Sequence, residues 1–456
     1  MKKTLSFFFV LALSMKMLAG GLMTNTNYHI AFDRMMARGA THEIDAIFSN
    51  PAGMAWGHEG WQLSFNWQNP HQNRDIEADF AYGIDGAGMP LMYHKKYEGK
   101  ATAPFVPGLF ASYKHDRWSL GAMFGIIGSG GSVKYDAGLP MFDQGVMALV
   151  FQNTGGMLTP DKYIMDSQVK GRQYIYAGQV NFAYRMTDYL SAAVGFRVNY
   201  YDGNYSGHVD AAHAMLGNLV NLQLDCTQRG WGFNPLISVN YHYKKWTLAA
   251  KYEFRTKINA SNTTNTLMIQ GQDVKAIAEQ IGSANTIATL SGQLGTEMAG
   301  KVAAYLPGEK TCYDIPALLS VAVGYEFTPQ FRATAEYHFF DDKNAKMSDD
   351  RQKELKRGTH EILLGAEYDI NKTFTVSLGG QRTDYGLSDG YQTNTSFACD
   401  SYSVGFGGAA NVNKHLRINV SYFWTMYSDY TKKTATGMET YSRTNGVFGL
   451  GVDYKF

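Results

Sequence analysis

The chain keeps a period of two in its hydrophobicity from Trp61 to its C-terminus. In the last segment an apolar face alternates with a small or polar one, and the apolar residues are Phe448, Leu450, Val452, Tyr454 and Phe456. Segments 246–254, 331–339 and 416–426 follow the same rule. Successive side chains of a β-strand point to opposite faces, so one face meets an apolar medium and the other meets polar groups. The pattern predicts a fold made mainly of such strands.

The number and spacing of these segments restrict the architecture further. We count about fourteen, which begin near residues 61, 103, 117, 168, 189, 231, 246, 316, 330, 358, 372, 399, 414 and 443. Very short turns, such as Thr187-Asp188 and Lys244-Lys245, alternate with long connections. This alternation is typical of an outer-membrane barrel with tight periplasmic turns and long external loops. An even number of strands also closes without a free edge, which hydrocarbon does not tolerate.

We therefore predict an all-β fold, a 14-stranded antiparallel transmembrane β-barrel over residues 61–456, in the bacterial outer membrane. A soluble β-sandwich is the alternative, but it would not need a signal peptide, Tyr-rich apolar faces and an aromatic C-terminus together. Aromatic residues make up 14% of the chain, which suits an interface between lipid and water. The terminal Phe456, with Tyr454 two residues earlier, also looks like the signal that barrel-assembly machinery reads.

Residues 1–19 have the features of a secretory signal peptide. Lys2 and Lys3 supply positive charge ahead of an apolar run, Leu5 to Leu13, that is too short to span a bilayer. Ala19 suits the position before cleavage. An N-terminal membrane anchor is the alternative. After residue 20 no run of about 18 apolar residues occurs, so we expect no transmembrane helix.

Charge and cysteine content point to no nucleic-acid partner, cofactor or metal. The formal net charge is only +1. Cys226, Cys312 and Cys399 are far apart and lack the spacing of a zinc site or a redox pair. At most one disulfide can form among them, and the sequence does not choose the pair.

Residues 20–60 lie between the signal peptide and the first strand and do not alternate. The stretch "YHIAFDRMMARGATHEIDAIF" has mixed polarity and a short helix-like part, which favours a plug inside the barrel lumen. Here the chain resembles a known family. "ARGATHEIDAIFSNPAGMAW" is similar to the N-terminal hatch of FadL-type outer-membrane transporters, which ends in an Asn-Pro-Ala turn, matched by Asn50, Pro51 and Ala52 and followed by Gly53. Residues 104–140 and 315–340 resemble strands two to three and eight to nine of that family.

The resemblance implies a function as well as a 14-stranded fold. Members of this family carry long-chain fatty acids or aromatic hydrocarbons passively across the outer membrane. The substrate lands among the external loops, moves to a pocket beside the hatch and leaves sideways where the third strand kinks inward. We accordingly expect a monomeric transporter whose partners are a hydrophobic small molecule, outer-membrane lipids and the barrel-assembly machinery.

The segment "GIIGSGGSVKYD", residues 125–136, is the candidate for the kink. Its glycines are Gly125, Gly128, Gly130 and Gly131. A phosphate-binding loop is excluded because no Gly-Lys-Ser/Thr follows. Glycine inside a strand marks a bend, a bulge or a close backbone approach. Either the bend opens the wall, or pairing is simply lost at the outer end of the strand.

Two long insertions are the candidates for ligand capture. Residues 206–229 carry Met215, Leu219 and Leu222, and residues 261–314 carry apolar residues that include Ile277 and Ile281, all at spacings of three and four. This spacing predicts amphipathic helices on external loops. Their apolar faces either line a groove for the substrate or pack on each other as a cap.

Basic residues on lumen-facing positions are the candidates for contact with a ligand carboxylate. They are Arg197, Lys251 and Arg255, with Arg332 as a further one. The alternative is that they pair with barrel acids such as Glu253 and Glu367. The family's basic residue late in strand five falls near Tyr201 or Asp202 in this chain, so that contact does not carry over.

Three other functions remain as alternatives. Some FadL-like barrels serve as protein-binding components of secretion systems. An outer-membrane hydrolase would need a nucleophile and a histidine at the lipid rim; His115, His242, His338 and His415 lie near strand ends without a nucleophile motif. A general porin is disfavoured by the plug.

Overall fold

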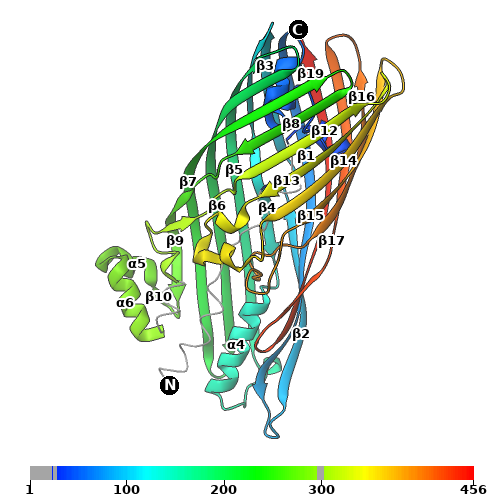
Figure 1. Ribbon diagram of the computed structural model, residues 1–456. Coiled ribbons are helices and arrows are strands. Elements are labelled where there is room, and N and C mark those ends of the chain that lie inside the picture. Colours follow the sequence, from blue (N-terminus) through cyan, green and yellow to red (C-terminus); the bar gives the residue numbers. More distant parts are fainter. Residues whose placement is uncertain (1–22, 24–27, 295–301) are drawn as a thin grey trace.

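The computed structural model describes Met23 and residues 28–294 and 302–456. The expected signal peptide lies outside these residues. Fourteen wall strands, all antiparallel, close into a barrel within this part of the chain, as the sequence predicts (Figure 1). No helix in the described ranges has the length and apolarity to cross a bilayer.

Most wall strands are single segments, namely β1 (Gly60–Ile84), β4 (Trp118–Tyr135), β5 (Ile164–Arg185), β6 (Leu190–His213), β7 (Gly217–Tyr243), β13 (Phe331–Phe340), β14 (Thr359–Asp369), β15 (Phe374–Asp384), β16 (Ser401–Asn411) and β19 (Gly437–Lys455). The others join two segments, namely β2 (Pro90–Thr102) with β3 (Val106–His115), β8 (Trp246–Glu253) with β9 (Asn259–Ile269), β11 (Lys310–Cys312) with β12 (Leu318–Glu326), and β17 (Leu416–Tyr427) with β18 (Tyr430–Lys433). The ladder between β1 and β19, from Gln62 opposite Lys455 to Phe80 opposite Gly437, closes the ring.

The strands are of two lengths. β13 has 10 residues, whereas β1 has 25 and β7 has 27. A tilted strand crosses a bilayer in roughly 9–11 residues. The long strands therefore continue beyond the membrane on one side, at the end opposite the short turns and the C-terminus (Figure 1). We call the short-turn end periplasmic, the membrane-crossing part the band, and the continuation the extension.

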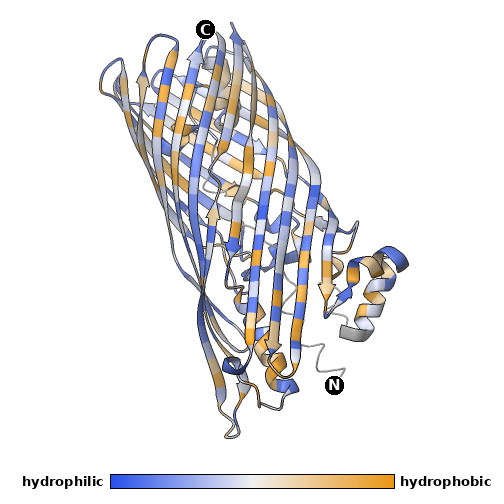
Figure 2. Cartoon of the chain, turned by 180° about the vertical axis from the view of Figure 1, so that it is seen from behind, coloured by the Kyte–Doolittle hydropathy of each residue, from blue (hydrophilic) through white to orange (hydrophobic). Residues whose placement is uncertain are grey.

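Hydrophobic and hydrophilic residues alternate along the long strands (Figure 2), and the apolar face changes from the outside to the inside along their length. On β7, Phe233 and Ile237 in the band face outward and are exposed, and Ser238 faces inward and is buried. Further along the same strand, Leu222 and Leu224 are buried on the inward face. β1 behaves likewise, with outward Trp61, Leu63 and Phe65 in the band and inward Ile76, Ala78 and Phe80 in the extension. The band thus has an apolar exterior, and the extension has an apolar interior.

The N-terminal residues fill the lumen near the periplasmic end (Figure 1). They form α2 (Ile30–Met35), α3 (Ala46–Ser49) and the 3-10 turn η1 (Pro51–Trp56). Every residue of α2 is buried, and α2 packs against β14 to β17 and β19. We call residues 28–57 the hatch.

Inside the extension lies a helix that the sequence analysis did not predict, α4 (Pro140–Asn153). It is buried along most of its length. It packs into an apolar core with the inward residues of the extension, among them Ile76, Phe80, Tyr97, Val169, Leu222 and Leu224. The other outer elements are η2 (Pro160–Lys162), β10 (Gln272–Asp273), α5 (Val274–Ile281), α6 (Ser283–Leu294), η3 (Asp342–Asn344) and η4 (Ser348–Glu354).

The prediction of an amphipathic helix on a loop at residues 206–229 is wrong. β6 runs to His213 and β7 starts at Gly217, so this stretch is a β-hairpin. Met215 lies at its tip and is 88% exposed, whereas Leu222 points into the extension and is buried. The sequence pattern does not indicate strands here because the inward face is apolar and the outward face is polar. This is the reverse of the arrangement in the band.

The second insertion, 261–314, begins as strand β9 and then contains α5 and α6. These helices lie beside the barrel next to β9 (Figure 1). Ile281 is exposed, and Val274 and Ala278 of α5 pack on the apolar core. Residues 295–301, within which the amphipathic pattern continues, lie outside the described ranges.

Candidate functional site

The hatch is held to one side of the barrel by charge. Arg38 donates to Asp45 at 2.6 Å and to Glu43 at 2.8 Å within the hatch. Its backbone N–H donates to Glu336 of β13 at 2.9 Å. Arg34 forms a buried ion pair with Glu367 of β14. A buried charge must be paired to be tolerated, so these contacts fix the orientation of the hatch.

The Asn-Pro-Ala-Gly turn at the end of the hatch is held by hydrogen bonds and close packing. The Asn50 amide donates to the carbonyl of Thr41 at 3.1 Å and to Asn240 of β7 at 2.8 Å. Pro51 starts η1, where its missing N–H costs nothing. A side chain at Gly53 would lie 2.5 Å from the Thr41 oxygen. Ser191 of β6 donates to the Ala52 carbonyl at 2.7 Å. All four motif residues are buried between the hatch and β6–β7.

A second contact anchors the same end of the hatch. Trp56 donates to Ser191 at 2.9 Å, and its ring lies 5.4 Å from that of His242 on β7. His42 is half-buried, and its ring lies 5.1 Å from that of His242. Burial lowers the pKa of His42 to about 4, and the neighbouring His242 acts in the same direction. The His42 imidazole is therefore neutral at pH 7.

A small cavity separates the hatch from the wall. Its lining combines apolar residues (Met23, Phe32, Phe48, Leu318 and Phe340) with polar ones (Arg38, Ser49, Lys251, Glu336, His338 and Glu361). Its volume is about 30 Å³. Ligand pockets usually measure roughly 300–1,000 Å³. In this conformation the cavity has room for water but not for a hydrophobic ligand.

Two of the four predicted basic residues meet beside this cavity. Arg197 lies 2.6 Å from Glu253, and Lys251 lies 2.8 Å from the same carboxylate. Lys251 also donates to the Phe48 carbonyl at 2.9 Å, and both cations lie over the Phe48 ring. Arg255 is elsewhere, 3.7 Å from Asp314 and partly exposed.

The wall between β3 and β4 is interrupted at the predicted glycines. Gly125 is the last residue of β4 paired with β3, and Ser132 is the first paired with β2. Residues 126–130 belong to neither of these two ladders, because the strand is interrupted between the end of β2 at Thr102 and the start of β3 at Val106. On the other side the pairing with β5 is irregular at 126–128 and at 129–131. Gly128 and Gly130 fall inside the stretch 126–130, and Gly125 and Gly131 border it.

The hatch touches the interruption directly. The Tyr28 hydroxyl donates to the carbonyl of Ile127 at 2.8 Å, and the Tyr28 ring packs edge-on against Phe48, 4.8 Å away. A side chain at Gly108 of β3 would overlap the Tyr28 carbonyl. No sequence signal singled out Tyr28, whose role depends on a contact 99 residues away in the chain.

A larger groove lies at the far end of the extension. It measures about 630 Å³ and is lined by Tyr82, Met92, Tyr93, Lys95, Asp136, Ala137, Asp143, Met147, Pro160, Asp161, Tyr163, Met165, Asp166 and Ser167. These residues come from β1, β2, α4, η2, β5 and the connections beside α4 and η2, none of which the sequence analysis assigned to ligand capture. Residues 206–229 and α5 do not contribute to the lining.

One acid of this groove is buried in an unusual way. Asp143 of α4 is 1% exposed. One of its oxygens accepts from Lys95 and from the Tyr97 hydroxyl, both at 2.8 Å. The other, Oδ1, has no hydrogen-bond donor among the described residues. Burial raises the pKa of the Asp143 carboxyl, and Lys95 and Tyr97 oppose that rise.

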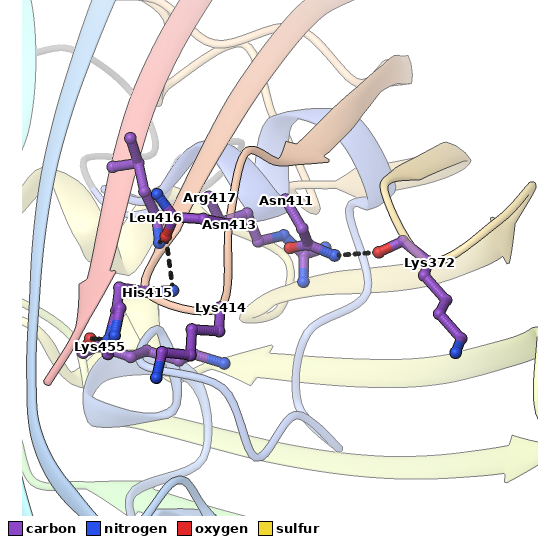
Figure 3. A pocket seen from close by; sticks show the side chains of 8 residues that line it. All are labelled: Lys372, Asn411, Asn413, Lys414, His415, Leu416, Arg417 and Lys455. Carbon is purple, nitrogen blue, oxygen red and sulfur yellow. Dashed lines mark hydrogen bonds between the residues drawn. The ribbon is translucent and has the colours of Figure 1, made fainter.

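A third cavity lies at the periplasmic end and is of a different kind (Figure 3). Its volume is about 360 Å³, and its lining residues are Lys372, Asn411, Asn413, Lys414, His415, Leu416, Arg417 and Lys455. His415 donates to the Lys455 carbonyl at 2.6 Å, and Arg417 lies 2.8 Å from Glu43 of the hatch. With Leu416 as its one apolar lining residue, this cavity does not suit a hydrophobic molecule.

The described residues offer no group of three or more His, Cys, Asp or Glu that could hold a metal. Cys226, Cys312 and Cys399 are all free thiols. His338 lies between Glu336, 2.7 Å away, and Glu361, 3.0 Å away. This histidine is thus bound within a carboxylate pair.

Comparison with known proteins places the fold. No protein-family model matches the chain, and no curated protein matches it in sequence. Among solved structures, a Pseudomonas aeruginosa FadL homologue is similar over 95% of this chain and 99% of its own, with a TM-score of 0.67 and 14% identity. The Pseudomonas putida toluene transporter TodX is similar over 92% and 97%, with a TM-score of 0.55 and 13% identity. The Ralstonia pickettii toluene transporter TbuX is similar over 90% and 94%, with a TM-score of 0.52 and 14% identity. The chain thus has the FadL/TodX-type fold that its sequence predicts, a closed 14-stranded barrel of the bacterial outer membrane.

Proposed function

We propose that this protein lets hydrophobic small molecules cross the outer membrane by passive diffusion. The observation that carries the proposal is the apolar interior of the extension, which leads from the outer groove toward a hatch in contact with an interrupted wall. The similar folds named above include toluene transporters, which supports the same class of cargo.

The outer groove is the site of capture in this proposal. Its aromatic and methionine side chains, such as Tyr82, Met92 and Tyr163, offer apolar surface. Burial of apolar area is worth roughly 25 cal/mol per Å². The groove adjoins α4, whose apolar faces continue inward through the core of the extension. In this proposal a hydrophobic molecule moves inward by displacing these buried apolar side chains.

The hatch cavity is the second binding site on the proposed route. At about 30 Å³ it admits no hydrophobic ligand, so the hatch side chains that line it, such as Phe32 and Phe48, must move when one arrives. Phe48 also packs against Tyr28. Displacing Phe48 would therefore disturb the Tyr28 contact with Ile127.

Release is sideways beside the stretch 126–130, which no ladder joins to β2 or β3. The outer surface of the barrel supports this step. Next to that stretch, β1, β3, β4 and β19 form an apolar groove of about 600 Å³ that faces the lipid, lined by residues such as Leu109 and Phe124. A molecule that leaves here enters the bilayer without crossing the polar, basic cavity at the periplasmic end. No chemical step is part of this route.

A disulfide staple across the interruption tests the route. A side-chain carbon at Gly131 would lie 3.5 Å from that of Ala103, within the range that disulfides require. The double variant Ala103→Cys/Gly131→Cys, in vesicles, should bind a fluorescent hydrophobe but release it slowly when oxidised. Dithiothreitol should restore release.

The single variant Ala103→Cys under the same oxidant is the control, because it contains the same three native thiols. Unchanged release from the stapled barrel would exclude the lateral route. Absence of any hydrophobe binding, in wild type as well, would exclude transport of hydrophobic molecules and favour a protein-binding role.

A further inference from the structure

We propose that the cargo is a hydrophobic molecule with an uncharged or cationic hydrogen-bond-donating head, and that carboxylates are rejected. This inference rests on the proposed function and names its substrate class. Two independent observations carry it, one at the outer groove and one beside the hatch.

The outer groove is acidic. Its lining contains four carboxyl groups, Asp136, Asp143, Asp161 and Asp166, and one ammonium group, Lys95. Lys95 is already bound to Asp143 at 2.8 Å. Asp136 and Asp166 have partners outside the lining, Lys134 at 2.5 Å and His208 at 3.2 Å. A carboxylate head would meet like charge here and find no free cation.

Asp143 also favours a particular head group. Its Oδ1 is a buried acceptor with no donor among the described residues. A buried acceptor without a donor is costly, and natural structures satisfy nearly all of them. An alcohol or ammonium head that reaches Asp143 would supply the missing donor, whereas a carboxylate cannot.

The cations beside the hatch cavity are all occupied. Lys251 shares Glu253 with Arg197, and Arg38 is bound to Asp45 and Glu43. His338 lies between Glu336 and Glu361. A ligand carboxylate could bind one of these cations only by displacing a protein carboxylate, which would then be buried without a partner.

Cations without a carboxylate partner among the described residues do occur in the third cavity, at Lys372, Lys414 and Lys455 (Figure 3). That cavity is lined by polar and charged residues apart from Leu416, and it lies on the periplasmic side of the hatch. It offers no apolar wall for the tail of an amphiphile. It therefore supplies a control for charge and does not serve as the cargo site.

Three amphiphiles with one common tail test the inference. Dodecanol, dodecylamine and laurate compete with a fluorescent hydrophobe for the full-length protein in nanodiscs at pH 7.5. We expect dodecanol and dodecylamine to displace the probe at concentrations at least tenfold lower than laurate. Equal or stronger displacement by laurate would overturn the inference and leave the proposed function standing. Displacement by none of the three would overturn the proposed function itself.

Two variants locate the selectivity. Asp143→Asn should weaken the binding of dodecylamine several-fold. It should leave the binding of dodecane unchanged, because dodecane has no head group. Glu253→Gln removes the carboxylate that Arg197 and Lys251 share and should strengthen the binding of laurate about tenfold. Glu361→Gln, which frees one side of His338, serves the same purpose if the first variant does not fold, as judged by heat-modifiable mobility on gels.

Lys455→Gln is the matched control, because it removes a cation from the periplasmic cavity. Its order of preference among the three amphiphiles should equal that of the wild type. If Lys455→Gln shifts the preference and Glu253→Gln and Asp143→Asn do not, selectivity lies at the periplasmic end and the inference is wrong.

Discussion

The band and the extension of this barrel use the same strands in opposite ways. On β7 the outward residue Ile237 is apolar and the inward Ser238 is polar, whereas further out the inward Leu224 is apolar and the outward Gln223 is polar. Lipid surrounds the band and water surrounds the extension. The comparison teaches that a period of two specifies a strand, and that the medium outside decides which face is apolar.

The largest expected effect comes from the inward face. Leu224→Ala in the extension removes a side chain that is 2% exposed and should lower the free energy of unfolding by ~2–5 kcal/mol. Ser238→Ala, inward in the band, loses one 3.3 Å hydrogen bond from the Ala52 N–H and should cost ~1 kcal/mol. Urea unfolding in vesicles measures both. Equal losses would mean that the extension has no apolar core of its own.

The outward face should respond in the reverse order. Ile237→Lys places a charge in the apolar band and should destabilise the barrel by ~2–4 kcal/mol if the site is near the bilayer midplane. Gln223→Lys lies on the same face of the same strand in water and should change stability by less than ~0.5 kcal/mol. The same vesicle assay compares the two. A substantial cost for Gln223→Lys would place the extension within lipid.

A buried acid at the outer end gives a pH effect. Burial raises the pKa of Asp342, in η3 beyond β13, to about 6. A group that binds its proton more tightly in the folded state loses stabilisation as pH rises from about 4 to about 6, here by up to ~3 kcal/mol. The melting temperature should therefore fall over this interval, and Asp342→Asn should flatten the profile. A wild-type profile that rises between pH 4 and 6 would contradict the assignment.

A small and local effect is expected where band and extension meet. Tyr28→Phe removes the 2.8 Å hydrogen bond to the Ile127 carbonyl and should cost ~1 kcal/mol. The amides of residues 126–132 should then exchange with solvent several-fold faster. Tyr113→Phe, on β3 near Trp61, is the control and should leave their exchange unchanged. Identical exchange in both variants would show that the hatch does not hold this stretch.

The inversion also explains which parts of the fold could be predicted from sequence. Predicted strand starts near 117 and 246 agree with β4 and β8, which begin in the band. Starts predicted near 103, 231 and 443 are late, because β2, β7 and β19 begin at Pro90, Gly217 and Gly437 in the extension. In the extension the alternation persists with the opposite polarity, so the sequence pattern there resembles that of a loop.

The site was predictable only where the sequence marks it locally. The glycines of 125–131 and the Asn-Pro-Ala-Gly turn are local signals, and the structure places them at the wall interruption and at the end of the hatch. Helix α4 gave no signal because its apolar residues are spread around the helix and are not confined to one face. The pairing of Arg197 with Glu253 and the contact of Tyr28 with Ile127 depend on residues far apart in the chain.

The change of polarity along the long strands also sets the vertical position of the barrel. If the barrel shifted outward by one residue pair, Trp231 would move into water, and if it shifted inward, Arg229 would move into hydrocarbon. Both shifts cost free energy. On β4 the stretch 126–130, which no ladder joins to β2 or β3, follows the last exposed apolar residue, Phe124, and precedes Lys134. The barrel therefore has a fixed immersion depth, and that depth holds the gap in its wall at the outer margin of the hydrocarbon layer, not at its middle.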